Sequence, residues 1–461
     1  MPSPSQLWAA ISKSATLQTF GKNSIVQAGE QLVNIIFGLA ITIYLARQWG
    51  PSIFGVWSIC LALLRIAMTC LSYGLDTIIL RHCSQQQAPD EKFLTGVIVL
   101  RAVNAALILG AALVGIHLLP AEDRTLANLT LVMMSALLVL PFEGLEFWFR
   151  ATKDAVAPAL ARSISVIAGS LLKAALVASG AAIIYVGAAH AFQIGLFGLI
   201  LLAVYLWRGH RFRFDTSVLG QIGGLYRDAW PLFITTLGYL VYARIDIMML
   251  AWLRGDHAAG TYAATVRISE VFDLAPVILL TAASPFLFNG MRNNVKKFSG
   301  LFQVFLTYLN LLFFAGALAV CLLSSFLVWL LFGSSYSESA GFLSIHIFGI
   351  VFIAQGVATQ YWWVARRRQR VVMWRALAGG VLNVILNLLL IPDYGGYGAA
   401  IATVISQFFS CVGMNVFLGR NGWYLLRMQL VPKFRLNKGL NLDELVGTPP
   451  KTLISDGARA Q

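Results

Sequence analysis

The sequence LVNIIFGLAITIYLARQWGPSIFGVWSICLALLRIAMTCLSYG, residues 32–74, decides the fold of this chain. Two apolar runs, within the spans 24–46 and 52–74, flank a short turn at Gly50 and Pro51. Each run holds about the 20 residues that an α-helix needs to cross the hydrocarbon core of a bilayer. The stretch therefore predicts a pair of transmembrane helices.

The same pattern recurs along the chain and predicts an all-α polytopic membrane protein with about 12 transmembrane helices. The further spans are 93–118, 125–149, 158–179, 184–207, 228–253, 260–288, 299–323, 340–364, 372–391 and 396–418. A short apolar piece, 324–332, is expected to bend back at the membrane surface. The composition agrees, because 58% of the residues are hydrophobic and 12% are charged, about half the charged fraction of a soluble domain.

The distribution of basic residues orients the helices. Of the 34 Lys and Arg residues, 26 fall in the two terminal segments and in alternate loops. The intervening loops hold three, Arg47, Arg124 and Arg254. Because cytoplasmic loops are enriched in cations, both termini are predicted to be cytoplasmic. The net charge of +14 thus indicates membrane loops, and no nucleic-acid partner is expected. No signal peptide is expected in residues 1–23.

A sequence repeat indicates two lobes. Residues 50–57 (GPSIFGVW) and 255–262 (GDHAAGTY) share the pattern G-x4-G-x-aromatic, and residues 187–191 (GAAHA) resemble 398–402 (GAAIA). The repeat predicts two six-helix lobes around a central cavity, where such folds bind substrate. The expected organisation is a cytoplasmic N-terminal segment (1–23), an N-lobe (24–207), a cytoplasmic linker (208–227), a C-lobe (228–418) and a tail (419–461) that is amphipathic and then disordered.

Ionisable residues inside the predicted helices are candidates for the transport site, because each costs about 2.5–3.5 kcal/mol at mid-bilayer. Four cations are expected to bind an anionic headgroup in the cavity: Arg65, Lys173, Arg244 and Arg267. Four anions are expected either to couple a H⁺ or Na⁺ gradient or to form structural ion pairs: Glu30, Asp246, Glu270 and Asp273. Arg267 and Glu270 are three residues apart, on one helical face, so they can pair. Glu143 and Glu146 are expected to be structural.

No catalytic or cofactor site is predicted. Neither a P-loop nor an H-E-x-x-H motif occurs, so ATP hydrolysis and zinc chemistry are unsupported. The five cysteines contain no C-x-x-C pair, and no metal site or disulfide framework follows.

Three stretches, 46–57 (ARQWGPSIFGVW), 244–268 with RIDIMML and GTYAATVRI, and 383–402 with NVILN and LIPDYGGYGAAIA, resemble a known family. They are similar to the polysaccharide-biosynthesis flippases of the multidrug/oligosaccharidyl-lipid/polysaccharide exporter superfamily, over most of residues 20–418. The resemblance implies two six-helix lobes around a cationic cavity. It also implies that undecaprenyl-pyrophosphate-linked glycan moves to the outer leaflet by alternating access. Arg244 and Asp246 match the arginine–aspartate feature of the family's seventh helix.

The leading hypothesis is therefore a flippase for an O-antigen, capsule or exopolysaccharide unit in the bacterial cytoplasmic (inner) membrane. Its expected partners are the lipid-linked oligosaccharide, membrane lipids, a polysaccharide polymerase and a chain-length regulator. One alternative is an ion-coupled multidrug exporter of the same superfamily, whose cationic cargo favours anions in the cavity. Another is a membrane glycan polymerase or ligase, which needs a large outer loop, whereas every predicted outer loop is short.

Overall fold

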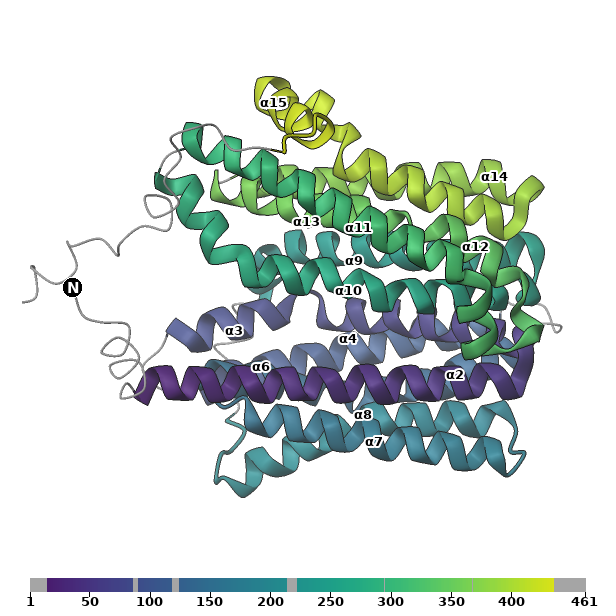
Figure 1. The fold of residues 1–461 in the computed structure, drawn as a ribbon. Helices are drawn as coiled ribbons and strands as arrows, with labels where there is room; N and C mark the ends of the chain where they lie inside the picture. Colours follow the sequence, from purple (N-terminus) through teal and green to yellow (C-terminus); the bar gives the residue numbers. More distant parts are fainter. Residues whose placement is uncertain are drawn as a thin grey trace, which may run out of the picture. The chain divides into compact units, whose positions relative to one another are not determined.

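The computed structural model describes residues 15–85, 90–117, 124–213, 222–293, 295–366 and 368–434. Among these residues every regular element is a helix, which confirms the all-α prediction (Figure 1). In the described part of the chain, seven helices are long and apolar enough to cross a membrane, or up to nine if each of two bent pairs forms one span. The chain is thus a multi-pass membrane protein, and the count of twelve spans stays a prediction.

The chain divides into two compact units, Met1–Arg244 and Ile245–Gln461. The first contains α2 (Ala15–Ser72), α3 (Leu75–Gln85), α4 (Glu91–His117), α5 (Arg124–Met134), the 3₁₀ turns η2 (Ser135–Leu138) and η3 (Leu140–Glu143), α6 (Gly144–Ala151), α7 (Val156–Ala178), α8 (Ile183–Trp207) and most of α9 (Ile222–Arg254). The second contains the end of α9, then α10 (Asp256–Asn293), α11 (Val295–Phe332), η5 (Ser334–Tyr336), α12 (Glu338–His346), α13 (Gly349–Ala365), α14 (Gln369–Cys411), η6 (Gly413–Phe417) and α15 (Gly419–Leu430).

Two of the longest helices are interrupted at a glycine. Gly50 breaks α2 with φ 70° and ψ 176°, between the predicted spans 24–46 and 52–74. Gly395 breaks α14 with φ 54° and ψ −129°, close to the predicted boundary between the last two spans. Positive φ is accessible to glycine because it has no Cβ. Pro51 is then well placed in the first turn of a new helix. Proline has no N–H, but the first N–H groups of a helix have no partner within the helix, so no hydrogen bond is lost.

The prediction for residues 324–332 was wrong. They continue α11 without interruption, and the helix ends only before Gly333, which has φ 88°. The segment SSFLVWLLF contains neither proline nor glycine, so nothing in its backbone stops the helix earlier.

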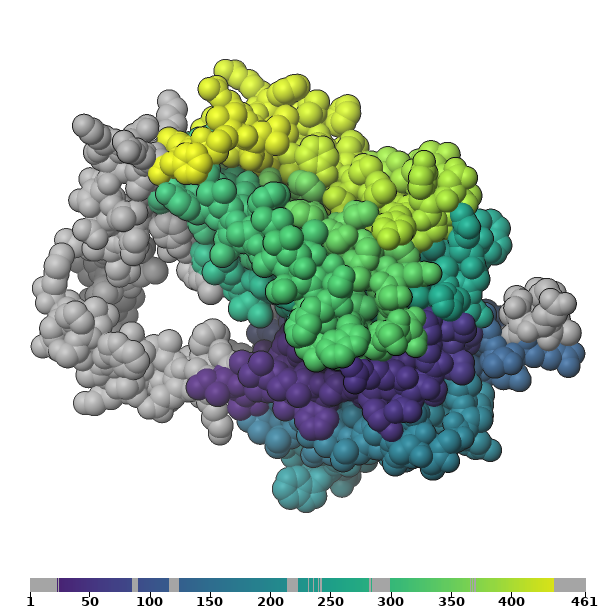
Figure 2. Space-filling view, turned by 45° about the vertical axis from the view of Figure 1, so that its right-hand side comes forward, coloured from purple at the N-terminus to yellow at the C-terminus, as the bar shows by residue number. Residues whose placement is uncertain are grey.

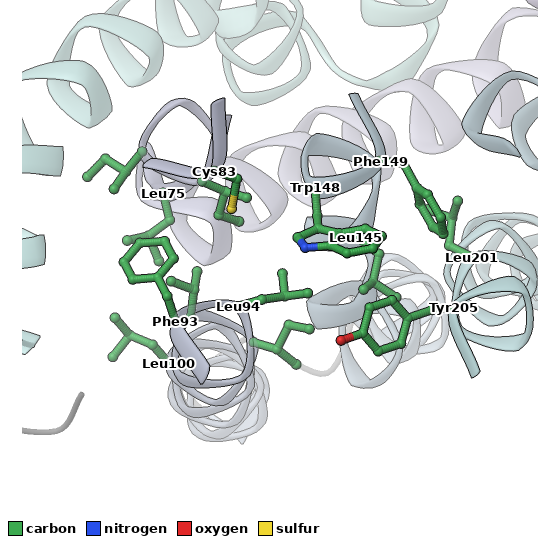
Figure 3. Packing of buried hydrophobic residues seen from close by; sticks show 14 of the residues in the cluster. Leu75, Cys83, Phe93, Leu94, Leu100, Leu145, Trp148, Phe149, Leu201 and Tyr205 are labelled. Carbon is green, nitrogen blue, oxygen red and sulfur yellow. The ribbon is translucent and has the colours of Figure 1, made fainter. Parts of the chain in front are cut away.

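The core of the first unit lies where α3, α4, α6 and α8 meet (Figure 3). Trp148 is 2% exposed, and its ring contacts Tyr205 edge to face with centroids 5.2 Å apart. Leu94 and Leu145 are fully buried beside them. Lipid tails are as apolar as these side chains, so the hydrophobic effect does not drive helices together in a bilayer. Close packing of this kind holds them together instead.

The first part of α9 packs on the first unit. Ala229 is fully buried in the same core cluster, and the Tyr226 hydroxyl donates to Asn104 Oδ1 at 2.6 Å. The Tyr73 ring stacks on Phe233 with centroids 4.3 Å apart. The division between the units at residues 244 and 245 therefore falls inside α9. The predicted lobe and linker boundaries stay predictions, and residues 214–221 of the linker lie outside the described part of the chain.

Candidate functional site

A half-buried arginine near the start of α7 joins three helices of the first unit. The Arg162 guanidinium contacts Glu30 Oε1 of α2 at 3.2 Å and Glu143 Oε1 of η3 at 3.5 Å. It also donates to Glu146 of α6, which is 3% exposed. Glu146 contacts Arg150 as well, at 2.5 Å. Charge-assisted bonds of this kind are the strong ones, so Arg162 ties α2, α6 and α7 together.

A second arginine extends this network. Arg101 of α4 is 1% exposed and donates to Asp76 of α3. Its Nη2 lies 3.8 Å from Glu143 Oε2, which links it to the Arg162 group. Within the described residues this connected set, called the N-unit charge network, has four carboxylates and three guanidinium groups: Asp76, Glu30, Glu143 and Glu146 with Arg101, Arg150 and Arg162. Among the described residues this network thus has one carboxylate more than it has guanidinium groups.

The predicted cavity cations of the first unit lie in different surroundings. Lys173 of α7 is 4% exposed, and its Nζ donates to Gln193 Oε1 of α8 at 2.8 Å. Arg65 lies on the second half of α2, and its side chain is exposed. Arg244 is half-buried in α9. Of the predicted cations in this unit, Arg65 is thus the most accessible to a ligand.

Three predicted site residues lie on α10. The pair expected from their spacing is present, because Arg267 Nη1 donates to Glu270 Oε2 at 3.0 Å. Their side chains remain 27% and 36% exposed, so the pair can still meet a ligand. Asp273 lies about one turn further along the helix and is half-buried. The positions form one charged stripe along α10.

Asp246 is the best enclosed of the predicted anions. Its side chain is 3% exposed, although it lies on a helix beside Arg244. Asp246 Oδ2 accepts the hydroxyl proton of Tyr262 at 2.8 Å and a weaker contact from Thr403 Oγ1 at 3.4 Å. Its Oδ1 accepts the Ile247 N–H at 2.9 Å. Residues two apart on a helix point in different directions, and Asp246 points toward α10 and α14.

A chain of polar side chains continues from Asp246 into α14. Asn383 Nδ2 lies 3.4 Å from Thr403 Oγ1 and 3.2 Å from Ser406 Oγ. Asn387 Nδ2 donates to Asn383 Oδ1 at 3.0 Å, while the buried Asn387 Oδ1 has no hydrogen-bond partner among the described residues. A buried carbonyl oxygen without a donor is costly. A carboxylate with neutral oxygens nearby is the ligand set that hard cations prefer.

Several of these polar residues were not predicted from sequence. Arg162, Tyr262, Thr403 and Asn387 carried no predicted role. The spacing of Asn383 and Asn387, four residues apart in an apolar run, was the available signal. Arg375, which also carried no predicted role, is 5% exposed and donates to the carbonyl oxygens of Ser410 and Cys411 at the end of α14, where it acts as a helix cap.

Comparisons with known proteins place this architecture among membrane transporters. The family model described as polysaccharide biosynthesis protein matches residues 20–291. A relative named probable flippase AglR, from Haloferax volcanii, is 25% identical over 401 residues, covering 83% of this chain and 80% of that protein.

Solved structures support the same fold. The lipid II flippase MurJ, in an inward closed conformation, superposes with a TM-score of 0.70 at 16% identity and covers 88% of this chain and 90% of its own. An inward-facing multidrug resistance transporter of the MATE family gives a TM-score of 0.65 at 14% identity, covering 86% and 94%. At these identities the similarity shows the fold alone.

Proposed function

Because this chain belongs to the polysaccharide biosynthesis protein family, whose model matches residues 20–291, we propose that it is a flippase for a lipid-linked oligosaccharide. The cargo is an undecaprenyl-pyrophosphate-linked unit of O-antigen, capsule or exopolysaccharide, moved by alternating access. The family match carries this proposal. The named flippase relative supports it, and the fold suits it, since the two units provide the paired halves that alternating access requires. The chain is a transporter and not an enzyme.

The cationic side chains supply the proposed contact with pyrophosphate. Arg65, Arg244 and Arg267 all keep some exposure, and arginine grips phosphate with a planar fork. Lys173 would take part after α7 and α8 separate enough to release Gln193. Transient binding by several cations suits a carrier, because a cargo that is held too tightly cannot leave.

We further propose that Asp246 binds the coupling ion, H⁺ or Na⁺. The observation in favour is its enclosure by Tyr262 and Thr403, with the unpartnered Asn387 oxygen in the same chain of polar groups. Glu30, in the N-unit charge network, is the second candidate, because that network has one carboxylate more than it has arginines. The paired Glu270 and the half-buried Asp273 are the others.

The proposed location is the bacterial cytoplasmic (inner) membrane, with both termini in the cytoplasm. The positive charge of alternate loops supports this orientation. A polysaccharide polymerase and a chain-length regulator are the proposed functional partners, since an exported unit must be assembled further outside the membrane.

Complementation of a deletion strain tests the proposal. The wild-type chain should restore surface polysaccharide and should leave tolerance of cationic dyes unchanged. Restored dye tolerance without polysaccharide would favour the multidrug exporter instead. Arg65→Gln should lower export at least tenfold with normal membrane insertion, whereas Arg124→Gln, an exposed control, should export normally.

Ion coupling is tested in vesicles. Asp246→Asn should abolish the dependence of glycolipid transfer on an imposed H⁺ or Na⁺ gradient, because the amide cannot carry the charge. Asp154→Asn, which removes a partner of Arg208 near a helix end, is the control. Gradient-driven transfer by Asp246→Asn at the wild-type rate would contradict the proposed role.

A further inference from the structure

The chain of the second unit ends, in its described part, with a segment strapped along α11. This C-terminal strap comprises α15 and residues 431–434. Four hydrogen bonds hold it, and each joins one atom of α11 to one of the strap: Gln303 Nε2 to the Val431 carbonyl at 2.9 Å, the Lys433 N–H to Thr307 Oγ1 at 2.9 Å, the Tyr308 hydroxyl to the Phe434 carbonyl at 3.3 Å and Asn310 Nδ2 to the Gln429 carbonyl at 3.5 Å.

The length of α11 gives the depth of the strap. The helix has 38 residues, which at 1.5 Å each is about 57 Å, far more than the roughly 30 Å of the hydrocarbon core. Residues 298–332 contain no charged side chain, and Lys296 and Lys297 come directly before them. At about 52 Å, this uncharged stretch is longer than the hydrocarbon core. The strap contacts residues 303–310, in the part of this stretch that follows the two lysines. The strap also carries Arg420, Arg427 and Lys433, which are costly to place in hydrocarbon. It therefore lies level with the lipid headgroups at one face of the membrane.

The outward face of the strap mixes aromatic and cationic side chains. Trp423 is 56% exposed, Tyr424 46% and Phe434 55%, while Arg420 and Arg427 are exposed between them. The opposite face of α15 is buried against the second unit, with Leu425 fully covered. Figure 2 shows the strap, in yellow, on the surface of this unit. Water disfavours exposed tryptophan and hydrocarbon disfavours arginine, but the headgroup layer suits both.

The charge around the strap has a single sign. Residues 419–434 contain no Asp or Glu, and neither does the segment 366–370, which comprises the loop after α13 and the first two residues of α14. Arg366 of this loop is joined to the strap, since its Nη1 lies 3.5 Å from Asn421 Oδ1. The nearby Arg368 and Arg370 are exposed. A cationic surface at headgroup level attracts anionic lipid.

We propose that the exposed face of the C-terminal strap binds the phosphate groups of anionic phospholipids. Arg420 and Arg427 hold the phosphates, and the Trp423 ring lies among the glycerol groups, as amphipathic interfacial helices do. The proposal rests on the depth and charge of the strap, and it does not depend on what the protein transports.

Lipid-dependent stability of the full chain in neutral detergent tests the proposal. Phosphatidylglycerol should raise Tm more than phosphatidylcholine does for the wild-type chain. Arg420→Gln/Arg427→Gln should lose at least half of this difference, whereas Arg47→Gln/Arg124→Gln, which removes two other exposed cations, should keep it. Equal responses of the wild-type chain and Arg420→Gln/Arg427→Gln would overturn the proposal.

A second measurement separates lipid binding from a contribution to folding. The chain is reconstituted in bilayers whose lipids carry bromine on the upper part of the acyl chain. The difference in fluorescence between the wild-type chain and Trp423→Phe isolates Trp423, and these lipids should quench it by half or more. If aqueous iodide quenches Trp423 and the brominated lipids do not, the exposed face of the strap lies in water. That result would overturn the proposal and would favour an acidic soluble protein as the partner of this face.

Discussion

Individual buried charges in the first unit depend on one another. Arg162 contacts three carboxylates on α2, η3 and α6, and Arg101 shares Glu143 with it. Removing one member of such a network leaves its partners partly buried with less compensating charge, which is more costly than the net value of the pair. The network is therefore more sensitive to the loss of a cation than to the loss of its surplus carboxylate.

Arg162→Gln should destabilise the protein by about 3 kcal/mol, because it leaves three partly buried carboxylates without their shared cation. The measurement is Tm of the purified chain in detergent. Glu30→Gln removes one carboxylate and should cost much less. If both variants melted together with the wild-type chain, the network would have no structural role.

Asp90 caps the first turn of α4, outside the membrane-spanning segments. Partial burial acts to raise its pKa, but hydrogen bonds from the Phe93 N–H at 3.0 Å and from His82 hold the pKa below its ordinary value of 3.8. A depressed folded-state pKa gives stability that is complete above the ordinary value and is lost as pH falls through the folded value.

Asp90→Ala should therefore cost about 1 kcal/mol at pH 7, the usual value of an N-cap. The Tm difference from the wild-type chain should shrink below pH 3.8. Asp90→Asn keeps a capping oxygen that does not titrate, so it should lose little at pH 7. A Tm gap that stays constant down to pH 3 would show that the charge of Asp90 is irrelevant.

The sequence predicted contacts within one helix better than contacts between helices. Glu30 and Arg162 are 132 positions apart (162 less 30), and no local spacing connects them. By contrast, the pairing of Arg267 with Glu270 follows from one turn of helix and was predicted. Helical period reveals neighbours on one element, whereas contacts between elements depend on how the helices pack.

At the scale of elements, glycine controls how closely chain segments approach each other. A Cβ on Gly398 would lie 2.4 Å from the Leu390 carbonyl oxygen, a backbone atom that cannot rotate away. Gly398 belongs to the repeat that indicated two lobes, and its counterpart Gly187 lies against the Leu129 side chain. The glycines of the repeat thus mark positions where chain segments come close together. The segment that each glycine contacts can be identified only from the tertiary structure.

Gly398→Ala should lower Tm substantially, by an overpacking cost of about 1–3 kcal/mol. Gly316→Ala is the matched control, because a Cβ there meets nothing within 4 Å. It should be neutral or slightly stabilising, since alanine is the better helix former by up to about 1 kcal/mol. Equal Tm values for the two variants would contradict the packing around Gly398.

Helix ends were less predictable than helix positions. The apolar run that became α11 was expected to stop at residue 323 because a span of that length already crosses the membrane. The backbone has no reason to stop there, and α11 continues to Phe332. Bilayer thickness sets the minimum length of a spanning helix, while a glycine or proline sets where it ends.

For the whole molecule, the alternation of basic and neutral loops predicts the orientation of every span. Alkaline phosphatase fused after Arg254 should be active, because that loop is predicted to be outside, and a fusion after Arg213 should be inactive. Green fluorescent protein at the C-terminus should fluoresce, since it folds in the cytoplasm. The reverse pattern would require the opposite orientation and would reverse the proposed direction of transport.

The position of Ala229 in the core of the first unit has a consequence for biosynthesis. The ribosome must extend the chain past α9's first turns, well beyond Trp207, before that core can close, a delay of about one to four seconds at ordinary elongation rates. During this interval the surface around Gly74, which Ala229 later covers, is open to chaperones and quality-control proteases. Translational pausing between residues 207 and 229 would therefore lower the yield of inserted protein more than pausing after α9 is complete.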